Sequence, residues 1–349
     1  MSIKVSILLP NLNNRPYLER RIQSILDQTL DEWELIVMDG YSQDGAWEFF
    51  QACAAAEPRI RIYQSAEKGI YNNINRCLEL AVGDNIYIAT SDDTMTRETL
   101  EKMTKALEEN PECDIAHCKL KIIDEEGNLS PEKTWDNFFI IRYFGEYIDK
   151  KHIRRAPHDG LLHYCGITVY TSLTQLLIRR RLFDRIGPFL VDYGSIADYE
   201  WDMRASLVAD TVHIPEYLAT WRVHRDQATT DDRIIRAKAQ GKFLELSDNA
   251  LRIAVKLKPD LKKTYRIPKF RGHLEKEYFF LEMKTHTHFL KRLAICLKWL
   301  ILRPRFAFVW INLFRRGRKD CLSQEEILHH FKTLMAQQGL DKNLISIES

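Results

Sequence analysis

Two adjacent acids, Asp92 and Asp93, follow a short apolar run from Ile86 to Ala89. A run rich in β-branched and aromatic residues predicts a buried strand, so both carboxylates are expected at the carboxyl end of that strand. Ligands of open α/β sheets bind at that end, and a pair of fixed carboxylates suits a divalent cation with oxygen ligands. A solvated turn is the alternative, because aspartates are common in turns.

Polar residues also follow three other predicted strands. The apolar runs 5–9, 35–38 and 60–64 precede, in order, Pro10-Asn11, Asp39 and Glu67-Lys68-Gly69. Ligands of an open parallel sheet bind where its strands end, so these residues are expected to converge with Asp92 and Asp93. The shared edge predicts a binding site for a ligand of nucleotide size.

The elements that must position these residues alternate along the chain. Apolar residues at helical spacing predict helices over 16–28, 46–56 and 71–81, each joining two of the four strands through short links. Such alternation predicts a parallel sheet with right-handed crossovers and helices on both faces. The predicted fold class is therefore α/β.

Composition and absent motifs exclude several classes of protein. The 349-residue chain has a net charge of +2, which gives no global argument for nucleic-acid binding. Its seven cysteines contain no Cys-x-x-Cys pair, which favours a reducing compartment over a disulfide framework. No Gly-x-Gly-x-x-Gly follows the first strand and no P-loop motif occurs, so dinucleotide enzymes and P-loop NTPases are disfavoured. The remaining possibility is a site in which side chains and a metal ion hold a nucleotide.

Four segments resemble, in their order and spacing, the family 2 glycosyltransferases of the GT-A fold. They are Val5–Asn11 (VSILLPN), Val37–Gly45 (VMDGYSQDG), Glu67–Arg76 (EKGIYNNINR) and Ala81–Asp93, which ends in Thr-Ser-Asp-Asp. The third segment is similar to that of bacterial enzymes that build cell-surface polysaccharides. The resemblance implies a GT-A mixed sheet flanked by helices over residues 1–230, with a nucleotide-sugar half over 1–125 and an acceptor half over 126–230.

The resemblance also implies which residues bind the donor nucleotide. Asp39 matches the acid that hydrogen-bonds the nucleotide base, and Pro10 and Asn11 lie beside the base and ribose. Lys68 and Gly69 belong to the third donor-binding motif. The donor would be a UDP-, dTDP- or GDP-sugar.

Metal binding is implied at the family's Asp-x-Asp position, where Thr90 replaces the first acid. A Mn²⁺ or Mg²⁺ ion would then depend on Asp92 and Asp93. The need for a cation is physical, because a carboxylate and a phosphate 4 Å apart repel by roughly 4 kcal/mol at an effective dielectric constant of 20. A bound cation reverses that sign and neutralises charge on the leaving diphosphate. Arg76 is a candidate second counter-charge, with an exposed helical arginine as the alternative.

A later acidic segment, 195–204, resembles the family's segment in which an acid opens a helix that ends in arginine. Asp198 matches the catalytic base, which takes the proton of the acceptor hydroxyl in an inverting transfer. Asp202 and Glu200 are rivals by residue type. On a helix, Asp198 and Asp202 share one face as an i, i+4 pair while Glu200 points away. Ser195 is expected to cap this helix.

The segment 219–230 runs from a strand into polar turn residues. It resembles the family's closing segment, in which a histidine approaches the diphosphate or the metal. His224 is accordingly a candidate third metal ligand or phosphate donor, and a structural histidine is the alternative.

Between these motifs, the turn Glu126-Gly127-Asn128 predicts a hairpin at the edge of the sheet. The segment 129–165 is aromatic, basic and without clear periodicity, which is common in binding loops. It is expected either to bind the acceptor or to form a helical covering layer.

Residues 231–349 are expected to form a helical C-terminal region. The apolar runs 293–302 and 306–314 are separated by Arg303-Pro304-Arg305, and no acid occurs between Lys291 and Lys319. Neither run approaches the roughly 20 residues that a membrane span requires. Two helices in the interface of an anionic inner leaflet fit this pattern, with Trp299 and Trp310 at headgroup depth. A helical hairpin packed on the catalytic domain or on a second subunit is the alternative.

These expectations combine into one hypothesis. The protein is an inverting, metal-dependent glycosyltransferase that acts on a glycan or lipid-linked acceptor in surface polysaccharide synthesis, in the cytoplasm at the inner face of the plasma membrane. A non-catalytic nucleotide-sugar-binding module is a rival, for which Thr90 is the sequence hint. A nucleotidyltransferase is a weaker rival, because the segment 11–15 after the first strand is not a glycine-rich phosphate loop.

Overall fold

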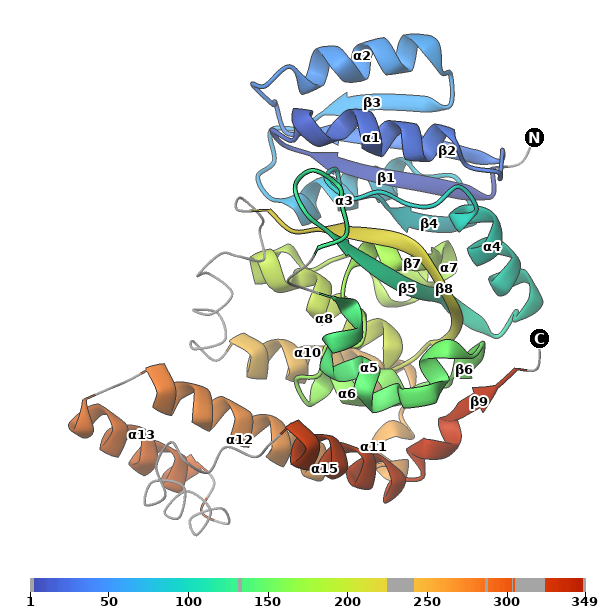
Figure 1. The fold of residues 1–349 in the computed structure, drawn as a ribbon. Helices are drawn as coiled ribbons and strands as arrows, with labels where there is room; N and C mark the ends of the chain where they lie inside the picture. The colour runs from blue at the N-terminus through green and yellow to red at the C-terminus, as the bar shows by residue number, and fades with distance from the viewer. Residues whose placement is uncertain are drawn as a thin grey trace.

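The fold was analysed in a computed structural model, which describes residues 3–130, 134–224, 242–285, 288–302, 304 and 324–347. One mixed sheet runs through the described part of the chain, with the strand order β3-β2-β1-β4-β7-β5-β8-β6-β9 (Figure 1). Helices flank this sheet, and a helical arm formed late in the chain projects from the body. The predicted α/β class is confirmed.

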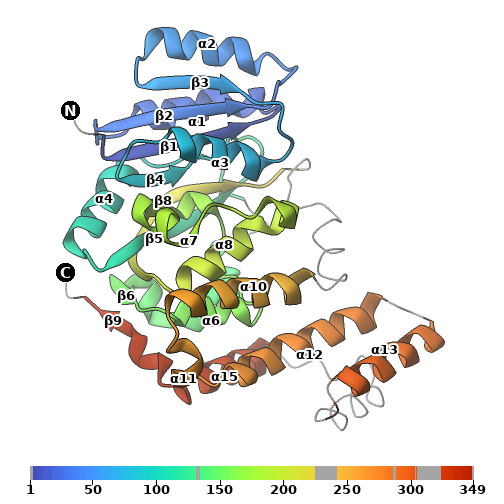
Figure 2. The same ribbon diagram turned by 180° about the vertical axis from the view of Figure 1, so that it is seen from behind.

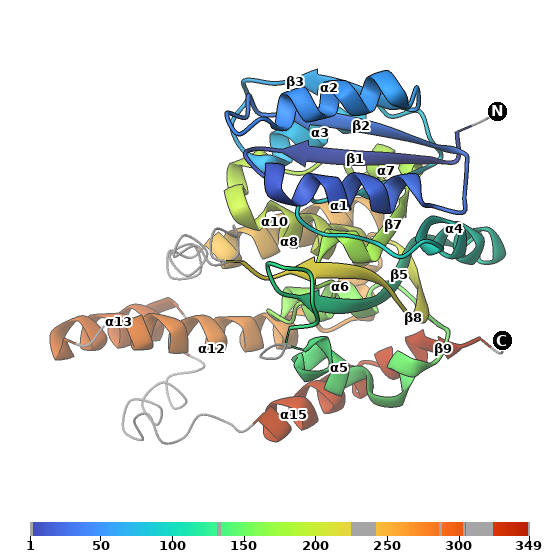
Figure 3. The same cartoon turned by 45° about the horizontal axis from the view of Figure 1, so that its top comes forward.

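The N-terminal half alternates strands and helices as predicted. Its elements are β1 (Val5–Asn11), α1 (Arg15–Leu26), β2 (Trp33–Asp39), α2 (Ala46–Ala56), β3 (Ile60–Gln64), α3 (Ile70–Leu80) and β4 (Asn85–Ile88). The four strands pair in parallel. α1 and α2 lie on one face of the sheet (Figure 3) and α3 lies on the other (Figure 2), which explains why every residue of β1 and β2 is buried.

The second half of the sheet is mixed. Its strands are β5 (Cys113–Ile123), β6 (His152–Arg154), β7 (Leu176–Arg179), β8 (Asp210–Arg222) and β9 (Leu344–Ser346). β7 lies antiparallel between β4 and β5, and β5 is parallel to β8. β8 therefore runs in the same direction as β1, β2 and β4, and its carboxyl end reaches the same edge of the sheet.

The predicted turn at residues 126–128 is present, but its predicted place at the edge of the sheet is wrong. β5 continues from Cys113 to Ile123 as one strand and lies between β7 and β8, inside the sheet. The turn after it closes a single antiparallel bridge between Ile123 and Leu129. A strand in this position is covered on both sides by neighbours from distant parts of the chain, which local turn chemistry does not reveal.

Short helices cover the second half of the sheet. They are α4 (Thr99–Glu109), α5 (Phe139–Phe144), α6 (His158–Tyr164), α7 (Arg180–Ile186) and α8 (Ala197–Ser206). The segment 129–165 contains α5, β6 and α6, and its large aromatic residues Trp135, Tyr143 and Phe144 are buried. Of the two predicted alternatives, the covering layer describes this segment.

The C-terminal region is not purely helical. Its helices are α10 (Lys242–Leu257), α11 (Leu261–Thr264), α12 (Ile267–Thr285), α13 (Phe289–Leu302) and α15 (Gln324–Ala336). α15 contacts α5 through Phe331 and Phe139, whose ring centroids are 6.0 Å apart. β9 then pairs antiparallel with β6 and becomes the last strand of the sheet. The boundary predicted at residue 230 therefore does not separate a helical unit from the sheet.

The helices α12 and α13 form an arm that projects away from the sheet (Figures 1 and 2). Trp299 is 3% exposed and donates its indole N–H to Glu282 of α12 at 2.6 Å, so its predicted place at headgroup depth is wrong. The predicted second interfacial helix, 306–314 with Trp310, lies outside the described residues. No helix in the described ranges is long and apolar enough to cross a membrane.

Candidate active site

The first part of the site lies where β1 and β2 end. Asn11 and Asp39 are paired in register, and Asn11 Nδ2 donates to Asp39 Oδ1 at 2.8 Å. The Ser42 hydroxyl donates to the same oxygen at 2.7 Å, and the Ser42 backbone N–H donates to Asp39 Oδ2 at 2.9 Å. Asp39 is fully buried, whereas Asn11 Oδ1 is a buried acceptor without a hydrogen-bond partner. Pro10 lies within β1 and is buried.

Two exposed apolar side chains flank this cluster. Leu12, directly after β1, is 57% exposed, and Tyr41, just after β2, is 50% exposed. Tyr41 also has a φ of +59°, a left-handed conformation that is uncommon for an aromatic residue. Such strain is found where a structure holds a side chain in a required position. Neither residue was singled out from the sequence, although an aromatic residue within the turn after Asp39 is a visible signal.

The second part of the site joins the end of β4 to the end of β8. Asp92 Oδ2 and His224 Nε2 are 3.0 Å apart, although the two residues are 132 positions apart in the chain. Their side chains are 18% and 7% exposed, so both lie just beneath the surface. The parallel direction of β4 and β8 explains this meeting, because both strands end at the same edge of the sheet.

Asp93 points into the protein rather than beside Asp92. It is 2% exposed, and its oxygens accept hydrogen bonds from the Thr90 hydroxyl at 2.5 Å and the Arg222 backbone N–H at 2.6 Å. Burial, together with the charge of Asp92, raises the pKa of Asp93 to about 8. This geometry does not support the prediction that Asp93 holds a metal directly, because one oxygen binds Thr90 of the same loop and the other ties that loop to β8.

The remaining donor set was tested for its fit to a divalent cation. In the described part of the chain, no group of three or more His, Cys, Asp or Glu side chains is arranged to hold a metal ion. Asp92 and His224 nevertheless supply one carboxylate oxygen and one imidazole nitrogen at one place. Mg²⁺ sites that serve phosphates commonly use only one or two protein ligands, with phosphate oxygens and water completing the shell. The pair therefore fits a cation that is shared with a diphosphate.

The loop before α3 contributes backbone and exposed side chains. Lys68 and Gly69 are exposed, and Gly69 has a φ of +103°, which a residue with a side chain would adopt only under strain. Arg76 lies further along α3, where all three guanidinium nitrogens donate to Glu67 or Glu79. This exposed ion-pair cluster favours the surface alternative for Arg76, and a donor-binding role gains no support from it.

The third part of the site is the first turn of α8, which holds Asp198. The Asp198 carboxylate accepts the Tyr199 backbone N–H at 2.7 Å, and the side chain of Tyr71 on α3 lies near enough to lower the pKa of Asp198. Burial raises the pKa of Asp198 above its ordinary value. Tyr71 therefore connects α8 to the helix that starts at Gly69. The predicted cap Ser195 does not cap α8, whose N-cap position is Ile196.

The two rivals of Asp198 have different surroundings. Glu200 is buried and receives three hydrogen bonds from Arg204, between 2.9 and 3.2 Å, so it serves an internal ion pair. Asp202 is buried, and its Oδ1 has no hydrogen-bond partner. Burial and the charges of Asp198 and Glu200 raise the pKa of Asp202 well above its ordinary value. Burial beside two other acids therefore disfavours the charged form of Asp202.

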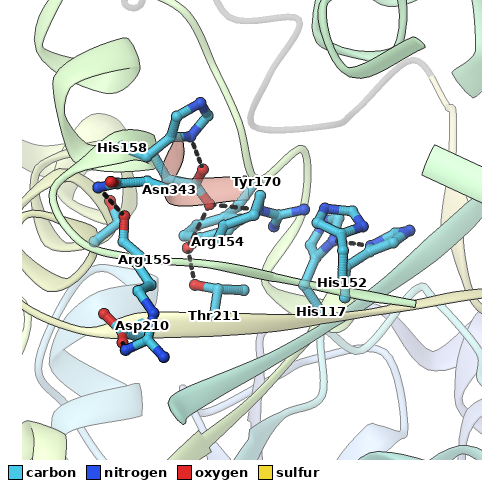
Figure 4. A network of polar contacts seen from close by, with 12 residues as sticks. His117, His152, Arg154, Arg155, His158, Tyr170, Asp210, Thr211 and Asn343 are labelled. Carbon is cyan, nitrogen blue, oxygen red and sulfur yellow. Dashed lines mark hydrogen bonds and ion pairs between the residues drawn. The ribbon is translucent and has the colours of Figure 1, made fainter. Parts of the chain in front are cut away.

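A buried polar network lies around Arg154 and Tyr170 (Figure 4). Arg154 Nε donates to Asp159 at 2.7 Å, and the Tyr170 hydroxyl reaches both Asp159 and Thr211. The network meets α8 where the Tyr199 hydroxyl donates to the backbone carbonyl of His163 at 2.6 Å. These contacts join β6, α6, β8 and α8, so they hold the helix that carries Asp198 against its neighbours.

Several contacting residues of the site were missed by sequence reasoning. The Tyr17 ring of α1 lies 5.2 Å from the His224 ring, and the Arg222 guanidinium lies 5.0 Å from the same tyrosine ring. Arg222 Nε also donates to the backbone carbonyl of Asp92 at 2.7 Å. These residues come from α1, β8 and the loop after β4, and no local pattern marks them.

The fold and this edge of polar residues define an α/β protein of the nucleotide-sugar transferase type. The family model described as Glycosyl transferase family 2 matches residues 6–185, and the chain belongs to this family and is a glycosyltransferase. The recognition made from the four sequence segments is thereby confirmed.

Among curated relatives, the chain is 30% identical over 124 residues to the putative teichuronic acid biosynthesis glycosyltransferase TuaG of Bacillus subtilis. This match covers 35% of the chain and 49% of TuaG, about half the length of that relative. The chain is 26% identical over 216 residues to a PGL/p-HBAD biosynthesis glycosyltransferase of Mycobacterium bovis, covering 60% of the chain and 73% of the relative.

Solved structures share the fold at low identity. The S. aureus TarS fragment 1–349 in complex with UDP has a TM-score of 0.54 at 15% identity, covering 92% of this chain and 94% of that one. The mannosyltransferase PcManGT from Pyrobaculum calidifontis, in complex with GDP-Man and Mn²⁺, has a TM-score of 0.53 at 16% identity, covering 97% and 86%.

Proposed function

We propose that the protein transfers a sugar, with inversion, from a nucleoside-diphosphate donor to a hydroxyl of a glycan or lipid-linked acceptor. The observation that carries this proposal is the meeting of Asp92 and His224 at 3.0 Å, at the sheet edge where the Asn11–Asp39 pair also lies. The complexes of fold relatives with UDP, UDP-GlcNAc and GDP-Man support a donor of this class.

The nucleoside binds at the ends of β1 and β2 in this proposal. Asn11 Oδ1 is a buried acceptor without a hydrogen-bond partner, which suits an N–H group of a nucleobase. Leu12 and Tyr41 present apolar surface beside it, and the tyrosine ring suits stacking on the base. Lys68, at the loop before α3, offers a positive charge toward the phosphate side of the donor. UDP, dTDP and GDP all meet these requirements.

The cation belongs between the donor diphosphate and the protein. Asp92 and His224 would hold Mn²⁺ or Mg²⁺, and the ion would neutralise negative charge on the leaving diphosphate. The Mn²⁺ in the complex of PcManGT supports this choice of cofactor. Asp93 takes the different role of orienting the loop, because its oxygens bind Thr90 and Arg222. Thr90, which replaces the first acid of the family motif, donates its hydroxyl to Asp93 and so helps to hold the loop after β4.

Asp198 is the proposed general base. The Tyr199 N–H and the nearby Tyr71 side chain hold its carboxylate in place. The raised pKa makes Asp198 a stronger base than an exposed aspartate, which favours removal of the proton from an acceptor hydroxyl as its oxygen attacks the anomeric carbon. Burial and the neighbouring acids disfavour the charged form of Asp202, so it is the weaker candidate for the base.

The acceptor is proposed to be a growing surface polysaccharide or its lipid-linked precursor. The names of relatives in teichuronic acid and PGL/p-HBAD biosynthesis support this class of product. A peripheral location at the inner face of the plasma membrane follows from such an acceptor. The rival function, nucleotide-sugar binding without chemistry, has the substitution at Thr90 in its favour.

The test compares Asp198→Asn with Asp202→Asn in an assay of donor hydrolysis and transfer, with UDP affinity measured in parallel. Asp198→Asn is expected to lose at least about 100-fold in rate, because general base catalysis contributes roughly that factor or more. UDP affinity and the rate of Asp202→Asn should stay near the wild-type values. Full activity of Asp198→Asn would overturn the base assignment, and a wild-type protein that binds UDP but turns over no donor would favour the rival.

A further inference from the structure

Helix α13 carries large apolar side chains on a surface of the protein. Leu290 and Ile301 are 75% and 80% exposed, and Leu293 and Leu297 are 38% and 52% exposed. Together these four residues, called the outer stripe of α13, form a concentrated group of exposed apolar side chains on one helix. Exposed apolar side chains scattered singly need no explanation, but a contiguous set on one element marks an interaction surface.

The outer stripe follows one face of the helix. At 100° per residue, its four members fall within an arc of about 80° around the helix axis. Cys296 and Trp299, which are 7% and 3% exposed, centre about 130° away from that arc and pack on α12. α13 therefore has two apolar faces, of which one is used for folding and the other faces outward.

Contacts with α12 fix which face points outward. The Trp299 ring lies 6.4 Å from the Phe279 ring, and the Trp299 indole donates to Glu282 at 2.6 Å. Lys298 Nζ is 2.9 Å from the other oxygen of the same glutamate. Rotation of α13 to hide the outer stripe would break these buried polar contacts. The arm itself projects from the body (Figure 1), which places the outer stripe at a protruding part of the molecule.

The charges beside the outer stripe are of one sign. α13 contains no acidic residue, and the exposed Lys291 borders the stripe on one side, next to Lys298, whose Nζ is paired with Glu282 of α12. Anionic lipid headgroups attract such lysines, each worth on the order of a tenfold gain in partitioning or somewhat less. A second copy of α13 packed on the stripe would instead bring lysines of equal sign together. The charge pattern therefore favours a lipid surface over self-association.

The dimensions of α13 suit a position in the plane of a membrane. The helix has 14 residues and is about 21 Å long, which is less than the roughly 30 Å hydrocarbon core of a bilayer. Amphipathic helices with lysines beside an apolar face lie in the interface with that face among the headgroups and upper acyl chains.

We propose that the outer stripe of α13 inserts into the interface of a bilayer that contains anionic lipids and docks the enzyme there through the α12–α13 arm. The inference deepens the proposed function, since it specifies the surface by which the enzyme reaches a lipid-linked acceptor. The docking itself requires neither donor nor metal. The docking proposal can therefore be wrong while the transferase proposal is right, and the transferase proposal can be wrong while the docking proposal is right.

The experiment is co-sedimentation of the full-length protein with vesicles of phosphatidylcholine, with and without phosphatidylglycerol. The wild type should bind the phosphatidylglycerol vesicles and release partly at high salt. Leu297→Glu/Ile301→Glu should lower the partition coefficient by at least roughly tenfold, because two apolar side chains lose their burial. The matched control is Leu257→Glu, at a 40% exposed leucine near the end of α10, which should bind like the wild type.

UDP affinity and thermal unfolding of the double variant should match the wild type, which separates lost docking from lost folding. Binding of the double variant equal to that of the wild type would overturn the proposal. Absence of wild-type binding to both kinds of vesicle would also overturn the proposal. A wild-type dimer in light scattering that the double variant converts to monomer, without vesicle binding, would assign the stripe to self-association and overturn the membrane proposal.

Discussion

At the scale of residues, two neighbouring aspartates have different tasks. Asp92 faces His224, whereas Asp93 turns inward to Thr90 and Arg222. The sequence predicted both as metal ligands because both are aspartates and both follow the same strand. Only the partners contributed by β8, far along the chain, distinguish them. The same holds for Asp198 and Glu200, which differ in their contacts with Tyr71 and Arg204.

Tyr41 offers a test of the nucleoside site at this scale. Tyr41→Ala should weaken UDP binding roughly 5- to 150-fold, because base–aromatic stacking is worth about 1–3 kcal/mol. Stability should not fall, since the ring is half exposed. Titration calorimetry with UDP measures the effect. Leu129→Ala, at another exposed apolar residue, is the control, and equal affinities of Tyr41→Ala and wild type would exclude stacking.

At the scale of elements, α8 combines the carboxylate proposed as the general base with a buried ion pair that holds the helix. Arg204 binds Glu200 and also donates to the carbonyls of Ile186 and Pro188, which end α7 and begin the loop to α8. Charged side chains buried to this degree are stable only when paired. The pair therefore positions the first turn of α8 from behind.

Glu200→Gln should lower the free energy of unfolding by roughly 3–5 kcal/mol, because the Arg204 charge would remain buried without its partner. Asp202→Asn is the matched substitution on the same helix. It should cost much less, since Asp202 Oδ1 makes no hydrogen bond that the amide would lose. Denaturant unfolding of both variants measures the difference. Equal losses would contradict the assignment of Glu200 as the structural acid.

The polar network around Arg154 and Tyr170 predicts acid sensitivity. His163 is fully buried between the rings of Tyr170 and Tyr199, and neither ring nitrogen has a hydrogen-bond partner. Burial lowers the pKa of His163 to about 3 from its ordinary 6.5. As the pH falls below 6.5, His163 is protonated in the unfolded chain but stays neutral in the folded protein. The free energy of unfolding therefore decreases as the pH falls from 6.5 to about 3.

His163→Phe isolates this effect, because the difference between variant and wild type cancels all other titrating groups. The variant should gain about 3 kcal/mol relative to the wild type between pH 7 and pH 4. Unfolding in denaturant at several pH values measures this gain. A difference that does not change with pH would show that His163 is not buried in its neutral form.

At the scale of the whole molecule, the N-terminal half could be predicted from the sequence because its order is local. Each strand of that half is an apolar run, and each helix follows it directly, so periodicity and turn residues define β1 to β4. The second half could not be predicted in this way. β7 enters the sheet antiparallel between β4 and β5, and β9 returns from the end of the chain to pair with β6.

The same division applies to the site. Asp39, Asp92 and Asp198 could be singled out from motifs that lie in continuous segments. The contacts of Tyr71 with Asp198, and of Tyr17 with His224, bring together elements more than a hundred residues apart. Long-range packing decides such contacts, and it also decides that Trp299 faces α12 instead of the solvent.

The central claim is a donor diphosphate and a divalent cation bound together at Asp92 and His224. The most direct measurement is calorimetric titration of UDP, dTDP and GDP with and without Mn²⁺, in the wild type and in Asp92→Asn and His224→Ala. Mn²⁺ should tighten the binding of at least one nucleotide by roughly tenfold or more in the wild type, and the gain should vanish in both variants. Nucleotide binding that is equally tight without Mn²⁺, or a gain that survives in both variants, would contradict the claim.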